Sequence, residues 1–184
     1  MNKNIVIVYH SGFGHTRRVA ESVAEGSGGT LLAVDAEGNI PEAGWNALDD
    51  ASAIIFGSPT YMGNMSWQFK KFADASSKAW AAQKWKDKLA GGFTNSASIA
   101  GDKQTTIYTM FTLAQQHGML WVGMGMMPSN VKASKRDDIN YLSSFAGLAT
   151  AAPADAAPNE MSEGDLQTAF LFGQRVRAAV ERLS

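Results

Sequence analysis

The chain of 184 residues contains no cysteine, which excludes disulfide bonds, thiolate catalysis and cysteine-ligated metal sites. It also lacks a surplus of charge, because 16 basic and 17 acidic side chains give a net charge of −1. Nucleic acid would therefore find no general electrostatic attraction on this chain. No apolar run is long enough to cross a bilayer, and Met1-Asn2-Lys3-Asn4 leads into a short strand-like run instead of a signal-peptide core. We therefore expect a cytoplasmic protein with neither a nucleic-acid partner nor membrane insertion.

Short apolar, β-branched runs alternate with helical patterns along the chain. The predicted strands are residues 5–9, 30–34, 53–57, 89–94 and 119–122. Thr16 is expected to cap a helix that ends at residues 26–29, and further helices are expected over 66–77 and 102–116. Ser162 and Asp165 resemble a capping box that opens a last helix. Pro59 lacks the donor needed to extend the third strand and is expected to end it.

This alternation predicts a single α/β domain over residues 1–184. Right-handed crossovers between parallel strands place helices on both faces of a sheet, which gives a three-layer sandwich. Five strands fit the order 2-1-3-4-5 better than a six-stranded dinucleotide fold. Residues 123–159 contain Pro128, Pro153 and Pro158 without firm periodicity, and we expect a long loop or mobile segment there.

Three loops follow predicted strands, at residues 11–16, 58–64 and 94–101. Open α/β sheets bind their ligands at the carboxyl ends of parallel strands, where these loops should lie together. The loops are rich in Gly, Ser, Thr and Asn and have almost no carboxylates. This composition favours a phosphorylated planar cofactor and predicts no metal site.

The first loop is compared with three known phosphate or phosphoryl motifs. A Walker A loop requires a lysine that Gly14-His15-Thr16 lacks. The dinucleotide motif would place its third glycine at Arg17, although Asp35 lies near the spacing of a ribose-binding acid and keeps this alternative open. A phosphoreceiver needs an aspartate where the chain has Gly57-Ser58. A tight turn that binds nothing also remains open.

The remaining pattern is that of flavodoxins, Thr/Ser-x-Thr-Gly-x-Thr, which Ser11, Gly14 and Thr16 match while Phe13 departs from it. Residues 54–66, Ile-Ile-Phe-Gly-Ser-Pro-Thr-Tyr-Met-Gly-Asn-Met-Ser, closely resemble the corresponding loop of WrbA-type NAD(P)H:quinone oxidoreductases. Lys103-Gln104-Thr105 and His117-Gly118-Met119 resemble two further landmarks of that family.

The resemblance implies a flavodoxin-like fold, an FMN cofactor and NAD(P)H as co-substrate. It further implies a quinone-like acceptor, two-electron hydride transfer and assembly into a homodimer or homotetramer. Phe13 and Trp80 correspond to aromatic residues at the nucleotide and substrate sites, and His117 is a candidate catalytic group near the ring. The implied cofactor-binding residues are Ser11, Gly12, Phe13, Gly14, His15, Thr16, Pro59, Thr60, Tyr61, Met62, Gly63, Asn95, Ser96, Ala97, Ser98, Ile99, Ala100 and His117.

Several alternatives stay open from the sequence. His117 lies at a predicted helix end, where a histidine often only stabilises the helix terminus. Trp80 can serve as interface packing, with a site role through a neighbouring subunit. The whole protein can be a single-electron flavodoxin or a non-catalytic FMN-binding module. Electron carriers of the first kind tend to be strongly acidic, and the net charge of −1 argues against that role.

Overall fold

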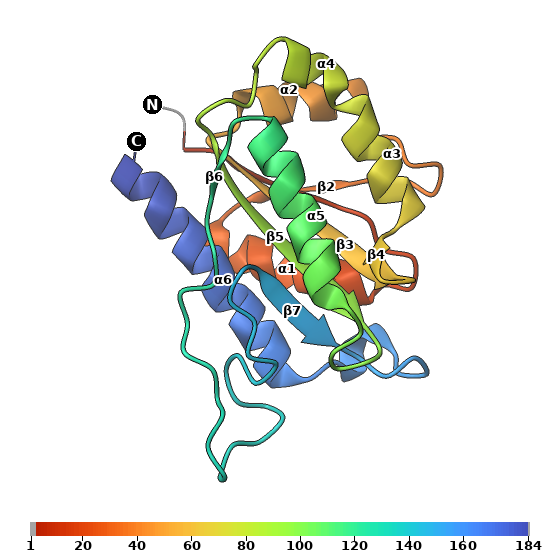
Figure 1. Cartoon of the computed structure of the whole chain (residues 1–184), viewed down its shortest axis with the longest axis vertical. Coiled ribbons are helices and arrows are strands. Elements are labelled where there is room, and N and C mark those ends of the chain that lie inside the picture. The colour runs from red at the N-terminus through yellow and green to blue at the C-terminus, as the bar shows by residue number, and fades with distance from the viewer. Residues whose placement is uncertain (1–2, 184) are drawn as a thin grey trace.

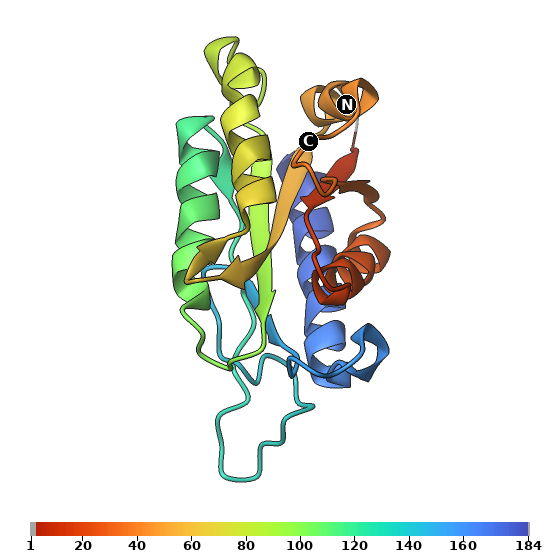
Figure 2. The ribbon, with the colours of Figure 1, turned by 90° about the vertical axis from the view of Figure 1, so that its right-hand side faces the viewer.

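The computed structural model describes residues 3–183, in which one twisted sheet lies between two layers of helices (Figures 1 and 2). Its strands are β1 (Ile5–Tyr9), β2 (Thr30–Ala33), β3 (Ala53–Tyr61), β5 (Leu89–Ser96) and β6 (Leu120–Trp121). They lie in the order β2-β1-β3-β5-β6 with parallel neighbours. The flavodoxin-like order predicted from the sequence is confirmed.

The fifth position of the sheet is filled by two separate strands. β6 pairs with the first residues of β5, whereas β7 (Leu148–Ala151) pairs with its end, from Phe93↔Leu148 to Ser96↔Ala151. The chain between them forms a long excursion that projects beyond the sheet in Figure 1. Residues 123–159 are therefore not only a loop, because they include β7 and the short 3₁₀ helix η1 (Pro158–Glu160).

Each face of the sheet has its own helices and its own hydrophobic cluster. One face is covered by α1 (His15–Ser27) and α6 (Glu163–Leu183). The other face is covered by α2 (Glu42–Asp50), α3 (Trp67–Ala75), α4 (Ser77–Ala81) and α5 (Lys103–Gln116). Figure 2 shows α1 and α6 on one side of the sheet and α3 and α5 on the other. Among the described helices, none is both long and apolar enough to span a membrane.

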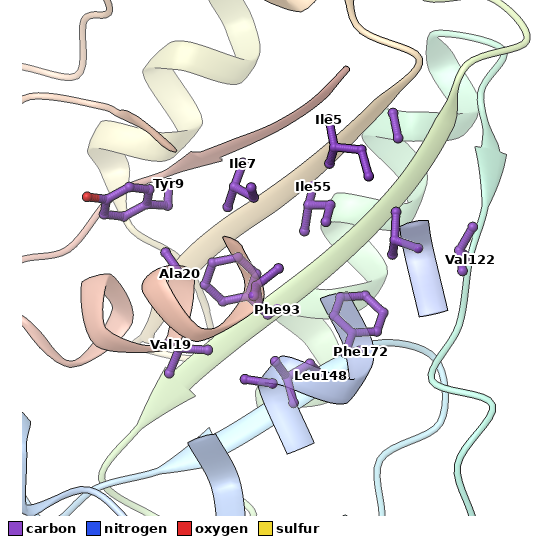
Figure 3. Packing of buried hydrophobic residues seen from close by; sticks show 14 of the residues in the cluster. Ile5, Ile7, Tyr9, Val19, Ala20, Ile55, Phe93, Val122, Leu148 and Phe172 are labelled. Atoms are coloured by element: carbon purple, nitrogen blue, oxygen red, sulfur yellow. The ribbon is translucent and has the colours of Figure 1, made fainter. Parts of the chain in front are cut away.

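Strand β1 contributes side chains to both hydrophobic clusters, because successive side chains of a strand point to opposite faces of the sheet. Ile5, Ile7 and Tyr9 belong to the cluster under α1 and α6, where Figure 3 shows them beside Phe93 and Phe172. Val6 and Val8 belong to the other cluster. All residues of β1 are buried, which explains why its sequence is apolar throughout.

Two local expectations are corrected. β3 does not end at Pro59 but continues to Tyr61, with Pro59 paired opposite Asn95. The pairing with β1 ends at Gly57 and the pairing with β4 begins at Thr60, so Pro59 has a strand partner only in β5, and a residue without an N–H is tolerated there. Thr16 does not cap α1, because the helix begins at His15 and Gly14 is its N-cap.

The sequence also gave no signal strong enough to predict α2. This helix contains Gly44, Asn46, Asp49 and Asp50, which are poor helix formers. Its stability comes from tertiary contacts, since Leu48 is fully buried and the ring of Trp45 stacks on that of Phe72 at 5.3 Å.

Candidate functional site

The loop between β1 and α1 folds around the hydroxyl group of Ser11. Its Oγ accepts hydrogen bonds from the backbone N–H groups of Gly14 and Arg17, at 3.1 Å each. Gly14 has a φ of 94°, which side-chain-bearing residues rarely adopt, and a Cβ there would lie 2.7 Å from Cγ of Pro158. Ser11 and Gly14 thus fix the shape of this loop.

The N-terminus of α1 leaves several backbone donors available at this loop. The hydrogen bonds found within residues 3–183 use the N–H groups of Gly14 and Arg17 but not those of Gly12, Phe13, His15 or Thr16. Free N–H groups at a helix N-terminus, together with the helix dipole, favour binding of an anion such as phosphate.

The second loop is a tight turn that connects β3 to β4 (Asn64–Met65). Tyr61 pairs with Asn64, and the two residues between them, Met62 and Gly63, have φ values of 47° and 78°. Two positive φ values are typical of a type I′ hairpin turn. Met62 adopts this left-handed conformation although it has a side chain, which costs conformational energy, and its side chain is fully exposed.

Buried hydroxyl groups connect the second loop to the third. The Oγ1 atom of Thr60 lies 2.7 Å from that of Thr94 in β5 and 2.7 Å from that of Thr106 in α5. On the other side of β3, Ser66 donates its N–H to Ser58 Oγ at 2.9 Å, and its hydroxyl lies 2.9 Å from Nδ1 of His10. These bonds hold the ends of β1, β3 and β5 in a fixed relation. Burial lowers the pKa of His10, so its imidazole is neutral at pH 7.

The third loop is tied to the strands beside it and to α5. Thr150 of β7 donates its hydroxyl to Oδ1 of Asn95 at 2.9 Å. Lys103, the first residue of α5, donates through Nζ to the carbonyl oxygens of Ser98 and Ile99. Lys103 is buried, and this burial is the main reason that its pKa is lowered to about 8.

A fourth segment, which follows β7, completes the site. His15 Nε2 lies 2.8 Å from the carbonyl oxygen of Ala156, so this segment contacts the first loop directly. Asp165 of α6 holds the end of β7, accepting the N–H of Ala151 at 2.8 Å and pairing with Arg136 at 2.6 Å. The hydrogen bond to Asp165 keeps the pKa of Arg136 above its usual value.

These four segments surround one cleft of about 450 Å³, which lies within the usual range for cofactor sites. The predicted residues that line it are Phe13, His15, Thr16, Pro59, Thr60, Tyr61, Met62, Gly63, Asn95, Ser96, Ala97 and Ser98. Gly101 and residues 152–154 complete the lining. The described lining contains no Asp, Glu, Lys or Arg side chain.

Five other predicted residues belong to the same loops without lining the cleft. Ser11, Gly12 and Gly14 shape the first loop, and Gly12 leaves room for Tyr61, whose hydroxyl would lie 2.6 Å from a Cβ there. Ile99 and Ala100 follow Ser98 in the third loop, with Ile99 exposed.

His117 lies away from this cleft, which corrects the expectation that it contacts the flavin ring. It follows α5, which begins beside the cleft and extends to the opposite end of the sheet (Figure 1). A helix of 14 residues spans roughly 20 Å. There His117 is buried, its ring stacks on Trp85 at 4.2 Å, and Nε2 lies 2.9 Å from Ser76 Oγ. Burial lowers its pKa, which favours the neutral imidazole.

Trp80 also lies outside the cleft of its own subunit. It belongs to α4, near the same far end of the sheet, and half of its side chain is exposed. A contribution of Trp80 to a site therefore requires a neighbouring subunit.

The sequence did not identify two parts of the site. In the sequence, Lys103 is only part of a family landmark, and its burial cannot be inferred because a lysine at a helix start is usually exposed. Residues 152–154 belong to the segment 123–159, which has no firm periodicity. Pro153 within this stretch and Pro158 after it are the available signal that the chain bends there. Within residues 3–183, no group of three or more His, Asp or Glu side chains is placed to bind a metal ion.

Comparison with known proteins agrees with this architecture. The sequence model of the NADPH-dependent FMN reductase family matches residues 35–133, which is more than half of the chain. Flavodoxin FldP of Pseudomonas aeruginosa is 52% identical over 178 residues, covering 97% of each chain. A protein named NAD(P)H dehydrogenase (quinone) from Geotalea uraniireducens is 32% identical over 204 residues, covering 98% of each. The crystal structure of a flavodoxin, WrbA-like protein from Agrobacterium tumefaciens has a TM-score of 0.83 and 51% identity over the full length of both chains.

A flavodoxin-like sheet with its cleft at the carboxyl ends of the strands defines a flavoprotein class. The chain belongs to the NADPH-dependent FMN reductase family, in its WrbA-like, flavodoxin-like group, and is an FMN-dependent oxidoreductase. Membership of this family confirms FMN as the cofactor and NAD(P)H as the electron donor.

The residues present fit FMN. Free backbone donors at α1 suit a phosphate group, and Gly12 and Gly14 keep the first loop free of side chains that would fill the space beside Tyr61 and Pro158. The absence of carboxylates from the described lining avoids repulsion of an anionic group. Thr60 to Gly63 and Asn95 to Ser98 offer backbone and amide groups to a planar heterocycle.

Proposed function

We propose that the protein transfers electrons from NAD(P)H to a quinone or similar small acceptor by two-electron hydride transfer, with both half-reactions in the same cleft. The observation that carries this proposal is the single cleft built by all four loop segments, with free backbone donors at one end. The relatives named NAD(P)H dehydrogenase (quinone) support the choice of acceptor.

Each part of the cleft has a distinct task in this proposal. The N–H groups of Gly12, Phe13, His15 and Thr16 hold the phosphate of FMN, and the second and third loops border its ring. When bound, FMN supplies the redox chemistry, since its ring accepts a hydride and delivers two electrons to an acceptor. The protein supplies binding, orientation and protection from water.

The mouth of the cleft suits flat, largely apolar reactants. Phe13 and Met62 are exposed there, and the ring of Phe13 lies edge-on to that of Tyr61, with centroids 6.4 Å apart. Such aromatic groups stack on nicotinamide and quinone rings. Burial raises the pKa of Tyr61, so its hydroxyl remains neutral and can donate a hydrogen bond to a reactant oxygen.

The second candidate function is that of a single-electron carrier, which the 52% identity to Flavodoxin FldP favours. Against the carrier function, a net charge of −1 is small for a protein that would find its electron-transfer partners by electrostatic steering. A third candidate is a module that binds FMN without catalysis.

Anaerobic stopped-flow measurement of the FMN-loaded protein separates these functions. We expect NADPH or NADH to bleach the flavin absorbance at about 1–10³ s⁻¹, and a benzoquinone to restore it within the same range. Negligible reduction by both nucleotides would support the carrier. A protein that stays colourless after incubation with FMN would contradict the cofactor assignment for the cleft.

We also propose a cytoplasmic location and a homodimer or homotetramer in which Trp80 contributes to the subunit interface. Its exposed indole on α4 supports this assignment, because aromatic residues are enriched at interfaces. Light scattering, which measures the mass of the assembly, tests the oligomeric state and the role of Trp80 when the native protein is compared with Trp80→Ala. An unchanged mass for the variant, or a monomeric native protein, would contradict it.

A further inference from the structure

Lys103 is a buried cation that the proposed chemistry does not use. Only 4% of its surface is exposed, and its Nζ donates to the carbonyl oxygens of Ser98 and Ile99. Its own backbone N–H donates to the carbonyl of Ala100 at 3.2 Å. Three consecutive carbonyl groups of the third loop are therefore directed at one residue.

The rest of this loop is weakly held. Gly101 and Asp102 both have positive φ values, 51° and 52°, so the chain turns sharply before α5. Inside the loop, Ser96 Oγ contacts the carbonyl oxygen of Ser98 at 3.4 Å, which is a long hydrogen bond. Ser98 lines the cleft and Ile99 follows it in the chain, so the two carbonyl contacts of Lys103 are made to a residue of the wall and to its neighbour.

The charges around Lys103 leave it without a carboxylate partner of its own. Asp165 from α6 acts on it at a distance and favours its charged form, and Arg136 from the excursion after β6 opposes that form. Asp165 is already bonded to both terminal nitrogens of Arg136, at 2.7 Å and 2.6 Å. Burial is the largest effect and lowers the pKa of Lys103 to about 8.

We propose that Lys103 is a positioning residue whose ammonium group holds Ser98 and Ile99 in the conformation that binds the flavin ring, so that FMN affinity depends on the protonation of this lysine. The proposal rests on the FMN assignment of the cleft. Deprotonation turns Nζ from a charged into a neutral donor and weakens both carbonyl contacts. The loop then loses the arrangement in which Asn95 to Ser98 border the ring.

The native protein provides the first test, a titration of FMN by flavin fluorescence at pH 7.0 and pH 9.5. With a pKa of about 8, roughly 90% of Lys103 is charged at pH 7.0 and about 3% at pH 9.5, so the apparent Kd should rise about 30-fold. The ionisation of the FMN phosphate changes little over this range, because with a second pKa of about 6 it is already about 90% doubly ionised at pH 7.0. Burial raises the pKa values of Tyr9 and Tyr61, which keeps both neutral.

Variants at Lys103 assign any pH effect to this residue. Lys103→Met should weaken FMN binding at least tenfold at pH 7.0 and remove the rise in Kd towards pH 9.5. Lys103→Arg keeps its charge at both pH values, so it should bind within tenfold of the native protein with a flat profile. Lys88→Met is the matched control. The Nζ atom of Lys88 also donates to backbone carbonyl oxygens, those of Leu48, Asp49 and Ala51, but these lie far from the cleft. It should keep the native affinity and pH profile.

The outcomes separate this proposal from the cofactor assignment. Tight FMN binding with the same Kd at both pH values overturns the role of Lys103 and leaves the FMN site intact. A pH effect that persists in Lys103→Met also overturns it. Failure of the native protein to bind FMN at pH 7.0 overturns both. If circular dichroism shows Lys103→Met to be unfolded, the native profile and Lys103→Arg decide between these results.

Discussion

The hydroxyl of Thr16 provides a direct test of the phosphate site. Thr16 is the second residue of α1 and lines the cleft, and no hydrogen bond within residues 3–183 involves its side chain. A hydrogen bond from such a hydroxyl to an ionised phosphate contributes about 1.5–3 kcal/mol. Since about 1.4 kcal/mol corresponds to tenfold in affinity, Thr16→Val should raise the Kd for FMN about 10- to 150-fold.

The comparison ligand for this test is riboflavin, which has the same ring without the phosphate. Thr16→Val keeps the shape of the side chain, so riboflavin should bind the variant and the native protein equally. Thr112→Val is the control, because Thr112 is an exposed residue of α5 whose hydroxyl bonds only within its own helix. Fluorescence titration measures all six affinities. An equal loss for both ligands, or no loss for FMN, would refute the placement of the phosphate at α1.

Three further predictions concern folding and pH. Gly173→Ala should lower the free energy of unfolding by about 2–3 kcal/mol in urea, because a Cβ there would collide with the carbonyl oxygen of Val23 where α6 crosses α1. Asp165→Asn should cost about 2–3 kcal/mol, below the usual range for a buried pair because the Arg136 side chain is 32% exposed. Burial lowers the pKa values of His117 and His10, so the unfolded chain binds more protons below pH 6.5 and stability should fall between pH 7.5 and 5.5. His117 contributes up to about 1.4 kcal/mol of this fall, so the fall should be smaller in His117→Gln.

Each of these measurements has a control within the same chain. Ala178→Gly changes an exposed position of α6 and should cost no more than about 1 kcal/mol. Lys70→Met removes the exposed ion pair with Asp74, which should change stability by less than about 1 kcal/mol. Equal effects of Gly173→Ala and Ala178→Gly, or of Asp165→Asn and Lys70→Met, would contradict the packing and charge arguments. A stability that does not change between pH 7.5 and 5.5 would contradict the third.

The sequence predicted the parts of the fold in which local pattern and tertiary role agree. The run Ile5-Val6-Ile7-Val8-Tyr9 is apolar at every position because both faces of β1 are covered, and the loops after β1, β3 and β5 contain the small polar residues that a tight ligand site requires. Placing those three strands side by side was enough to predict that their loops form one cleft.

Other parts depend on contacts that no local pattern reports. Leu148-Ala149-Thr150-Ala151 has little intrinsic preference for a strand, and it forms β7 because β5 offers an unpaired edge beyond Ala90. His117 illustrates a different failure. A helix that follows a parallel strand begins at the carboxyl end of the sheet and must end at the other, so the element order already placed His117 far from the cofactor. A resemblance to a family landmark does not contain that geometric information.

The excursion between β6 and β7 has a structural connection to the cleft that its sequence did not indicate. Arg136 lies in this segment and donates to the carbonyl oxygen of Ala151, the last residue of β7, at 3.1 Å, while its guanidinium group is fixed by Asp165. The next residues, 152–154, form one wall of the cleft. Because Asp165 also accepts the N–H of Ala151, a single ion pair holds both backbone groups of the residue that precedes this wall. The same two charges also act on Lys103, with Asp165 favouring and Arg136 opposing its charged form, so the groups that hold the wall after β7 are electrostatically connected to the lysine that contacts the third loop.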